Sequence, residues 1–578
     1  MSTRSKTLDP SPSNHFAATS RSSQRERVAI FAIWVLGTCV FFRHQIFSGF
    51  NNISGNVGDA RLDVYLHEHW LDVLRGRASW RSPAAFYPIK GTLGYSDTYA
   101  LNEIAYLPLR AAGMDPFLAY QWTLVCLSAI GFWTMQRFLS KISRLPEIWT
   151  ALLAYAFAFG NALYLKAGHP QLYSIYWMPV VAICALKAAQ ASHRRCSIIW
   201  ASLCGCLVGL ILFSTYYVGW FILFTGALFL VALVLVSATR QRLLLWRHEL
   251  SVGWPQIAAF GLSVAISLIP FGVIYLPVLH SIGGRKYSES MLFAARPGDM
   301  INAGRNNYVW GAGLRRVLSN SPRLVNSEVS LSLTPTILIL TLIAILMIWI
   351  ARWRTGRLAA QQLVNIASAV GAVIVASVLL PVKFGIGSLW RIPWLLAPGA
   401  VGIRAIDRLE IIVGFWVCVL LALALAYEQQ STQLRSSNTR RLRTTIVLAL
   451  LVFVAFEQIN LDENSTVHRQ RELQFIDKIP QPLATCRSFY VTESASPLDV
   501  FYVQSIDAML ISQHFRIPTI NGYSGQFPPG YGSLVYPTDA NYVPSVHAWA
   551  VAHSITAGLC SLDLSTQTWA LSEFDHTP

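Results

Sequence analysis

The sequence predicts a mainly α-helical, polytopic membrane protein that ends in a small α/β domain. Only 13% of its 578 residues are charged, and 54% are hydrophobic. A soluble domain carries about 25% charged residues. Long apolar runs recur up to about residue 460, and 19 Trp, 22 Tyr and 29 Phe suit a chain with many membrane interfaces. This composition excludes an ordinary soluble enzyme and a disordered chain.

The apolar runs predict about eleven membrane spans, because a spanning helix needs about 20 mostly apolar residues. The first run has no clear small-x-small cleavage site, so we expect an uncleaved helix rather than a signal peptide. The Ser- and Arg-rich residues 1–27 are predicted to be a disordered cytoplasmic segment. The predicted spans form a module over residues 28–460 and begin near Val28, Phe117, Ile148, Leu172, Ile198, Tyr217, Pro255, Leu331, Ala359, Ile411 and Thr444.

The net charge of +16 lies mainly in short loops between these runs. Basic clusters such as Arg137–Arg144 and Arg435–Arg443 all fall on one side of the predicted membrane. Since cytoplasmic loops are rich in Lys and Arg, that side is predicted to be the cytoplasm, and the membrane to be a cell's inner membrane. Orientation in membrane lipids explains the charge without a nucleic-acid partner. Loops 48–98, 282–330 and 381–410 and the tail 461–578 are then outside.

The tail carries eleven acidic residues and only five Lys or Arg. Alternation and helical spacing predict a strand at Ser488–Thr492, a helix at Leu498–His514, a strand at Ile517–Ile520 and a helix at Val543–Ser554. Together these predict a small α/β domain. Cys486 and Cys560 could form a disulfide if the tail is extracytoplasmic, or they could stay unpaired.

Acidic residues are rare in this chain, yet six of the 29 lie between residues 59 and 103. If residues 60–72 are helical, Asp59 and Asp63 share one face. Either could be a general base toward a hydroxyl, and Asp59 with Asp97 could also bind a divalent metal. The alternative is an N-cap role for Asp59. His67 and His69 diverge on a helix, so they are predicted to be structural or substrate-facing, and no metal ligand is assigned. Arg61 and Glu68 are further candidates for substrate binding.

Two other polar segments lie at predicted outer ends of spans. Lys166 and His169 could bind a lipid phosphate, with Gln171 beside them toward the substrate. The alternatives are an interfacial Lys and a turn-capping His. Arg404 and Arg408, four residues apart on one predicted helical face, could clamp a phosphate. Pairing with Asp407 and Glu410 is the alternative.

Several segments resemble the GT-C class of integral-membrane glycosyltransferases, especially its bacterial members. They are GDARLDVYLHEHW, FYPIKGTLGYSD, the GHPQL turn, the Arg404–Arg408 segment and NGYSG. The resemblance implies a GT-C-like bundle and transfer of a sugar from a polyprenyl-phosphate donor to an envelope glycan, lipid or protein. It also implies Asp59 as base, with Asp63 as the substitute, Asp97 near the acceptor or a metal, and Arg404 on the lipid phosphate.

Two other classes of function stay open from the sequence. A transporter or lipid-carrier flippase would often show repeated halves and charged groups inside the membrane. Here no halved repeat is found, and the acids crowd into a predicted outer loop, which favours an enzyme. A non-catalytic envelope assembly factor would depend on the tail rather than on Asp59. The chain has no Walker motif, HExxH or CxxC, so no cofactor is assigned, while a divalent metal is left open.

Overall fold

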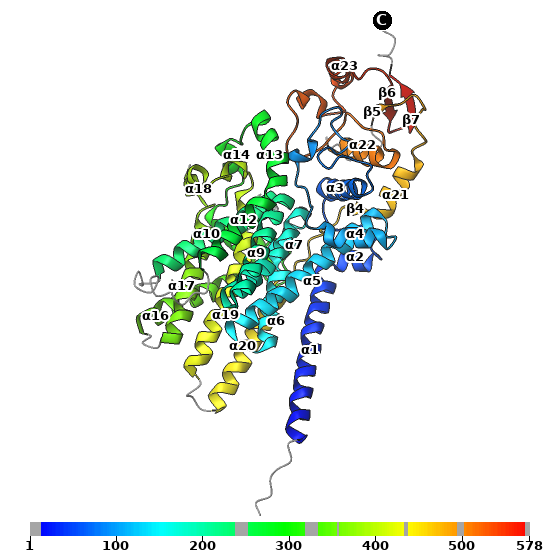
Figure 1. The fold of residues 1–578 in the computed structure, drawn as a ribbon. Coiled ribbons are helices and arrows are strands. Elements are labelled where there is room, and N and C mark those ends of the chain that lie inside the picture. The colour runs from blue at the N-terminus through cyan, green and yellow to red at the C-terminus, as the bar shows by residue number, and fades with distance from the viewer. Residues whose placement is uncertain are drawn as a thin grey trace, which may run out of the picture.

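The computed structural model describes residues 13–236, 253–317, 333–354, 358–385, 387–432, 437–493 and 502–572. Its helices form a large bundle. A second part, made of the first loop that is predicted to lie outside and the tail, stands at one end of this bundle and is called the outer part (Figure 1). The bundle helices are α1 (Ser13–Phe41), α5 (Pro116–Ser143), α6 (Glu147–Ala158), α7 (Asn161–Leu165), α8 (Met178–Gln190), α9 (Arg194–Ser214), α10 (Tyr216–Val236), α12 (Trp254–Ser267), α13 (Ile269–Ile282), α16 (Pro335–Arg354), α17 (Leu358–Leu379), α19 (Leu409–Thr432) and α20 (Ser437–Glu457).

Each of the eleven predicted spans coincides with helix, but fewer qualify as membrane spans. Among the described residues, eight helices are long and apolar enough to cross a membrane. The pair α12 and α13, bent by 52°, would be a ninth. Helices α1 and α20 are not among these, and both carry several charges: Arg25, Glu26 and Arg27 lie in α1, and Arg440, Arg441 and Arg443 lie in α20.

The N-terminal segment is more ordered than the sequence predicted. Helix α1 begins at Ser13, so the predicted disorder of residues 1–27 is wrong for residues 13–27, where no Pro or Gly interrupts the helix. Residues 1–12, and 318–330 of the predicted loop 282–330, lie outside the described residues. The membrane orientation and the domain boundaries stay predictions.

Short elements connect the bundle helices. Near the first outer loop they are α2 (Arg43–Phe47), β1 (Asn52–Ile53), α3 (Asp59–Leu74), η1 (Thr92–Tyr95) and α4 (Glu103–Ala111). Farther along they are η2 (Pro170–Trp177), α14 (Tyr287–Leu292), η3 (Pro297–Ile301), α15 (Gly311–Val317), β2 (Lys383–Phe384), β3 (Gly387–Ser388), α18 (Arg391–Leu396), η6 (Ala400–Gly402) and η7 (Ile406–Arg408).

The tail folds as a small α/β unit, as predicted. Its elements are β4 (Val467–His468), α21 (Arg469–Lys478), β5 (Ser488–Thr492), α22 (Tyr502–Phe515), η8 (Tyr531–Leu534), α23 (Tyr542–Ala552), β6 (Leu559–Asp563) and β7 (Thr568–Leu571). The sheet order is β5-β6-β7, with β5 parallel to β6 and β6 antiparallel to β7. Cys486 and Cys560, whose pairing the sequence left open, form a disulfide.

Three of the four predicted tail elements are confirmed. The strand Ser488–Thr492 is β5, and the two predicted helices correspond to α22 and α23, although residues 498–501 lie outside the described residues. The predicted strand Ile517–Ile520 is wrong. Only Thr519 makes an isolated bridge, to Phe489. Pro518 has no N–H to donate to a ladder, which explains why pairing stops there.

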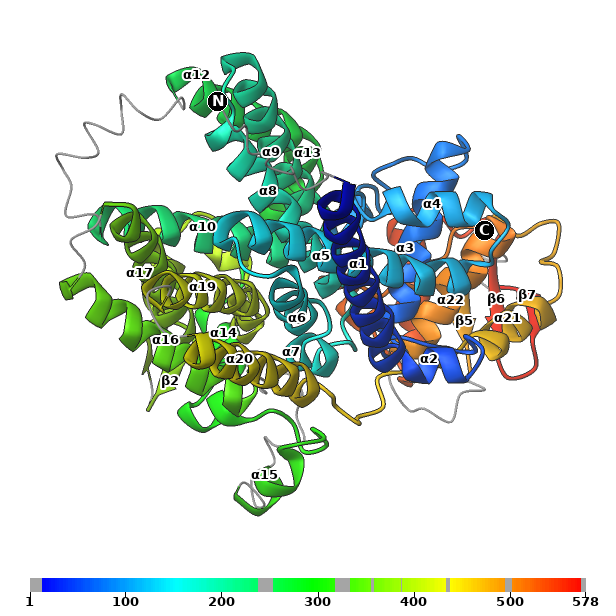
Figure 2. The ribbon, with the colours of Figure 1, turned by 90° about the horizontal axis from the view of Figure 1, so that it is seen from below.

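The outer part is built from both ends of the chain. Strand β1 pairs with β4, which places Asn52 opposite His468. Helix α3 lies beside α22, as Figures 1 and 2 both show. The first outer loop and the tail therefore form one packed unit, although more than 360 residues separate them in the sequence.

Candidate active site

A pocket of about 530 Å³ lies where the outer part meets the bundle. We call it the aspartate pocket, because Asp59, Asp63 and Asp97 all line it. The other predicted site residues that line it are His169, Gln171, Arg404 and Arg408. Four chain segments supply these seven side chains: the start of α3, the loop before Tyr99, the stretch from His169 into η2, and the segment Arg404–Arg408.

Asp59 stands in the first turn of α3, where a negative charge is favoured by the helix dipole. It is not the N-cap. The side-chain oxygen of Asn56 accepts from the backbone N–H groups of Gly58 and Asp59, at 2.8 and 2.7 Å. Asn56 also donates to the carbonyl of Gly168 at 2.7 Å, which ties α3 to the turn that carries His169. The carboxylate of Asp59 is thereby left for the pocket.

The carboxylate of Asp59 has two polar partners. His169 Nδ1 lies 2.5 Å from Asp59 Oδ2, and Gln171 Nε2 donates to the same oxygen at 3.4 Å. Burial alone would raise the pKa of Asp59. The hydrogen bond and charge of His169, the Arg408 guanidinium and Gln171 outweigh it and hold this pKa below its usual value. Asp59 is therefore an ionised, partly exposed carboxylate at neutral pH.

Asp63 and Asp97 are in different states from Asp59. Burial raises the pKa of Asp63 well above its usual value, although its carboxyl accepts from the hydroxyl of Tyr99. Burial also raises the pKa of Asp97, to about 6. Asp97 accepts from the backbone N–H of Tyr216 at 2.8 Å and so caps the start of α10. The pKa of Asp63 is raised by burial while that of Asp59 is lowered, so Asp59 ionises more readily and is the better candidate for the base.

The sequence predicted Arg404 and Arg408 on one helix face, and this prediction is wrong. Arg404 lies in a bend, where its backbone N–H donates to the Tyr217 hydroxyl at 2.9 Å. Arg408 ends η7, just before α19, and lies over the ring of Tyr217. The two still converge on the aspartate pocket. Arg404 is exposed, and no carboxylate of the described residues forms an ion pair with it.

Four predicted site residues are engaged elsewhere, outside the lining of this pocket. Arg61 is 2% exposed and pairs with Glu472 and Asp507 of the tail. The side chain of Lys166 is fully buried, with its ammonium 3.6 Å from Asp407. Both contacts lie within the fold, and the substrate role of Arg61 and the phosphate role of Lys166 stay predictions.

His67 and Glu68, two further residues with a predicted substrate role, also make contacts within the fold, and that role stays a prediction. His67 is buried, with Nδ1 2.5 Å from Glu103. Glu68 accepts from Arg110 and from the Tyr106 hydroxyl, at 2.5 and 2.7 Å. Both contacts join α3 to α4. His69 is also buried, next to the carbonyl of Trp80, which fits the predicted structural role.

Each of the three carboxylates of the pocket has a polar partner within the protein. Within the described ranges, no three His, Cys, Asp or Glu side chains gather in a way that could hold a metal ion. Asp63 is committed to Tyr99, and Asp97 to the start of α10.

The sequence missed several residues of the pocket. Tyr523, Gly525 and Gln526 of the tail line it, as do Tyr216 and residues of α13. The segment NGYSG, which contains Tyr523, was the one available signal. No comparable signal marks α13, because an apolar helix that lines a pocket has the same composition as one that faces lipid.

Two glycines allow the walls of the pocket to close. A Cβ on Gly94 would lie 2.5 Å from the carbonyl oxygen of Ile274, so η1 can pack against α13 only with glycine here. Gly399 has φ +82° and lies against the Tyr216 hydroxyl, which donates to its carbonyl at 2.6 Å. Both are close approaches that a side chain would block.

No protein-family model matches the chain, and no curated protein matches it. Solved structures do align with it. The oligosaccharyltransferase of Archaeoglobus fulgidus, in complex with Zn and sulfate, aligns at 11% identity with a TM-score of 0.44, over 92% of this chain and 67% of its own. ArnT from Cupriavidus metallidurans in the apo state aligns at 12% identity with a TM-score of 0.40, over 94% and 93%. ArnT bound to undecaprenyl phosphate aligns at 11% identity with a TM-score of 0.36, over 86% and 85%.

Proposed function

We propose that this protein is a membrane glycosyltransferase. It would move a hexosyl or pentosyl group from a polyprenyl-phosphate donor to an envelope glycan, lipid or protein acceptor, on the outer face of a cell's inner membrane. The observation that carries the proposal is the composition of the aspartate pocket. An ionised carboxylate, Asp59, and two guanidiniums, Arg404 and Arg408, line one cavity beside an apolar helix.

The proposed reaction needs only side chains of this pocket. Asp59 takes the proton of the acceptor hydroxyl, and the hydroxyl oxygen attacks the anomeric carbon. The bond from this carbon to the phosphate oxygen breaks, and the lipid phosphate leaves with its electron pair. Arg404 and Arg408 stabilise the charge that grows on the leaving group. One base and a single displacement predict inversion at the anomeric carbon, unlike the two-carboxylate retaining scheme.

His169 and Gln171 are assigned to the base rather than to the phosphate. Their nitrogens lie 2.5 and 3.4 Å from Asp59 Oδ2. Through these contacts they orient the carboxylate and keep its pKa low, so that it is ionised before the acceptor arrives. After the reaction, the imidazole of His169 offers a route by which the proton can leave Asp59.

Two features support a lipid-linked donor on the outer side. Leu276 and Leu279 of α13 line the aspartate pocket and are 51% and 46% exposed, so an apolar path runs along the pocket wall. The disulfide of Cys486 and Cys560 is typical of an oxidising compartment outside the cytoplasm. Both features suit a reaction at the outer membrane interface.

The test is to exchange Asp59 for Asn, which keeps the shape and removes the base. Mass spectrometry would compare envelope glycans from a deletion strain that carries wild-type protein, Asp59→Asn or Asp72→Asn. Asp72 lies on the same helix, outside the aspartate pocket, and is the matched control. We expect wild type and Asp72→Asn to restore a missing sugar, and Asp59→Asn to lose transfer by about 10²–10⁴-fold.

The protein level of each variant is measured in the same cells. If Asp59→Asn restores the sugar as wild type does at equal protein level, Asp59 is not the base. A transporter, flippase or assembly role would then explain the phenotype better. If no variant changes any envelope glycan, including the empty deletion strain, the glycosyltransferase proposal fails altogether.

A further inference from the structure

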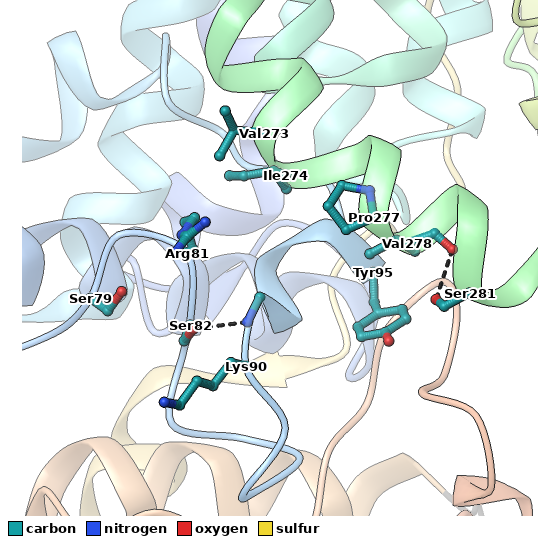
Figure 3. A pocket seen from close by; sticks show the side chains of 11 residues that line it. Ser79, Arg81, Ser82, Lys90, Tyr95, Val273, Ile274, Pro277, Val278 and Ser281 are labelled. Carbon is teal, nitrogen blue, oxygen red and sulfur yellow. Dashed lines mark hydrogen bonds between the residues drawn. The ribbon is translucent and has the colours of Figure 1, made fainter.

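A second cavity, of about 650 Å³, lies beside the aspartate pocket. The loop of residues 79–91 forms one wall, and α13 forms the other (Figure 3). Tyr95 and Val278 line both cavities, so η1 and α13 together make the partition between them. None of the chemistry proposed above uses this second cavity.

The loop wall of the second cavity is cationic and rich in hydroxyls. Arg81 and Lys90 both line it and are both exposed. No carboxylate of the described residues pairs with either, so their charge is available to a ligand. Ser82 accepts from the backbone N–H of Gly91 at 2.9 Å, which holds the two ends of this short loop together. The loop therefore presents two cations from a braced backbone (Figure 3).

The α13 wall is apolar and continues onto exposed helix surface. Val273, Ile274 and Pro277 line the second cavity. Val273 is 39% exposed, and Ile269, one turn earlier, is 61% exposed. An exposed apolar face on a bent pair that could span a membrane is suited to lipid contact. The cavity thus has a charged side and a side that leads to the bilayer.

We propose that the second cavity binds the anionic head group of a membrane amphiphile. Arg81 and Lys90 would hold the charge by charge-assisted hydrogen bonds, and the first carbons of the chains would lie along Val273, Ile274 and Pro277. A free phosphate would use only the loop wall, and a neutral lipid only the helix wall. This inference rests on the proposed function: the amphiphile is the acceptor of the sugar. It enters on the side of α13 that faces the second cavity, while the donor enters on the side that faces the aspartate pocket.

The experiment is photolabelling of the full-length protein. The probe is dodecyl phosphate with a diazirine on the chain, and the labelled residues are located by tandem mass spectrometry. We expect label on Val273, Ile274 or Pro277, which do not line the aspartate pocket. In Arg81→Gln/Lys90→Gln this labelling should fall about tenfold, since two charge-assisted contacts are lost.

The matched control is Arg75→Gln/Arg77→Gln, which removes two exposed cations just outside the cavity and should leave the labelling unchanged. Two further probes separate the sources of binding. A dodecyl glucoside with the same diazirine should label weakly, and millimolar inorganic phosphate should compete poorly. The proposal would be overturned if the glucoside labelled the protein as strongly as the phosphate probe. It would also be overturned if Arg75→Gln/Arg77→Gln lost as much label as Arg81→Gln/Lys90→Gln. Full displacement by inorganic phosphate would make this a phosphate site without lipid.

Photolabelling needs no turnover, so it stands apart from the Asp59→Asn test. Labelling that follows the prediction while Asp59→Asn stays active would keep the amphiphile site and remove the glycosyltransferase proposal. For the acceptor role, Arg81→Gln/Lys90→Gln should raise the acceptor KM about tenfold with little change in kcat. An unchanged KM would overturn the acceptor assignment.

Discussion

Three carboxylates line the aspartate pocket, and their surroundings divide them into different ionisation states. Asp59, with His169 and Arg408 nearby, has a lowered pKa, while burial raises the pKa of Asp63 well above its usual value. The pKa of Asp97, about 6, lies between them. Carboxyls whose environments push their pKa values apart can serve as base, proton store and anchor in one site. At neutral pH, Asp59 is the one best suited to accept a proton.

Asp97 should make the protein less stable as pH rises. Its pKa is raised in the folded state to about 6, mainly by burial, so the folded protein keeps a proton that the unfolded chain releases near pH 4. The associated stability is present below pH 4 and is lost as pH rises to 6, with an upper limit of about 3 kcal/mol. Asp97→Asn should therefore melt higher than wild type at pH 7.

The measurement is the melting temperature of both proteins in detergent at pH 7 and pH 4. We expect Asp97→Asn to gain about 1–3 °C at pH 7 and nothing at pH 4. Asn can still accept from the N–H of Tyr216, so the cap of α10 is kept. A gain of the same size at both pH values would mean that the effect is not titration of Asp97.

The sequence could predict the acids of the pocket but not the roles of their neighbours. Asp59 and Asp63, four apart, do share a helix face, as predicted from helix geometry. Arg61 is two residues from Asp59, about 200° around the helix, and so points to the opposite side. Its partners, Glu472 and Asp507, lie more than 400 residues away, and no local pattern could identify them.

At the scale of elements, one buried ion pair joins two segments of the aspartate pocket. Lys166 follows α7 and begins the turn that leads to His169, and Asp407 directly precedes Arg408. Their charged groups lie 3.6 Å apart, and both side chains are fully buried. The pair fixes the turn that orients the base relative to η7, which carries a phosphate-binding arginine. We therefore propose that Lys166 acts as a positioning residue, through its ion pair with Asp407.

Removing one member of the Lys166–Asp407 pair should lower the free energy of unfolding more than removing both. Lys166→Met leaves a buried carboxylate, which is expected to cost about 3–5 kcal/mol. Lys166→Met/Asp407→Leu should regain most of the melting temperature, because an apolar pair can replace a buried ion pair. Transfer kinetics would show a lower kcat in the single variant and a partial recovery in the double variant. A double variant less stable than Lys166→Met would argue against direct pairing.

Elements with strong periodicity were predictable, and elements fixed by distant partners were not. Each apolar run coincides with helix, and β5 occupies the predicted residues. The strands β6 and β7 escaped prediction because they are short and depend on pairing with β5. Arg404 and Arg408 have helical spacing, yet Arg404 lies in a bend before η7. Spacing of i and i+4 indicates a helix only where the backbone continues one.

At the scale of the whole molecule, the tail and the first outer loop enclose the aspartate pocket together. Tyr523, Gly525 and Gln526 of the tail line it opposite Asp59. Arg285, at the end of the bent pair, donates to the carbonyl of Gly525 at 2.9 Å and holds this tail segment against the bundle. A pocket built from both chain ends depends on their mutual packing, so contacts far from Asp59 should affect the reaction.

The ion cluster of Arg61 offers the sharpest test of this dependence. Arg61 of α3 pairs with Glu472 of α21 and with Asp507 of α22, and it is almost fully buried. Arg61→Met would leave two mostly buried carboxylates facing an apolar side chain, which should cost about 3–5 kcal/mol. We expect a lower melting temperature, faster proteolysis of the tail, and reduced transfer although Arg61 does not line the aspartate pocket.

Two comparisons separate loss of the cluster from general damage to α3. Arg75→Met removes an exposed cation at the C-terminal end of the same helix and should change none of the three readouts. Arg61→Met/Glu472→Gln/Asp507→Asn removes the uncompensated charge and should recover part of the melting temperature. If Arg61→Met slowed transfer while tail proteolysis and melting stayed at wild-type values, Arg61 would act on the substrate itself. The predicted substrate role, rather than the joint between the two chain ends, would then be correct.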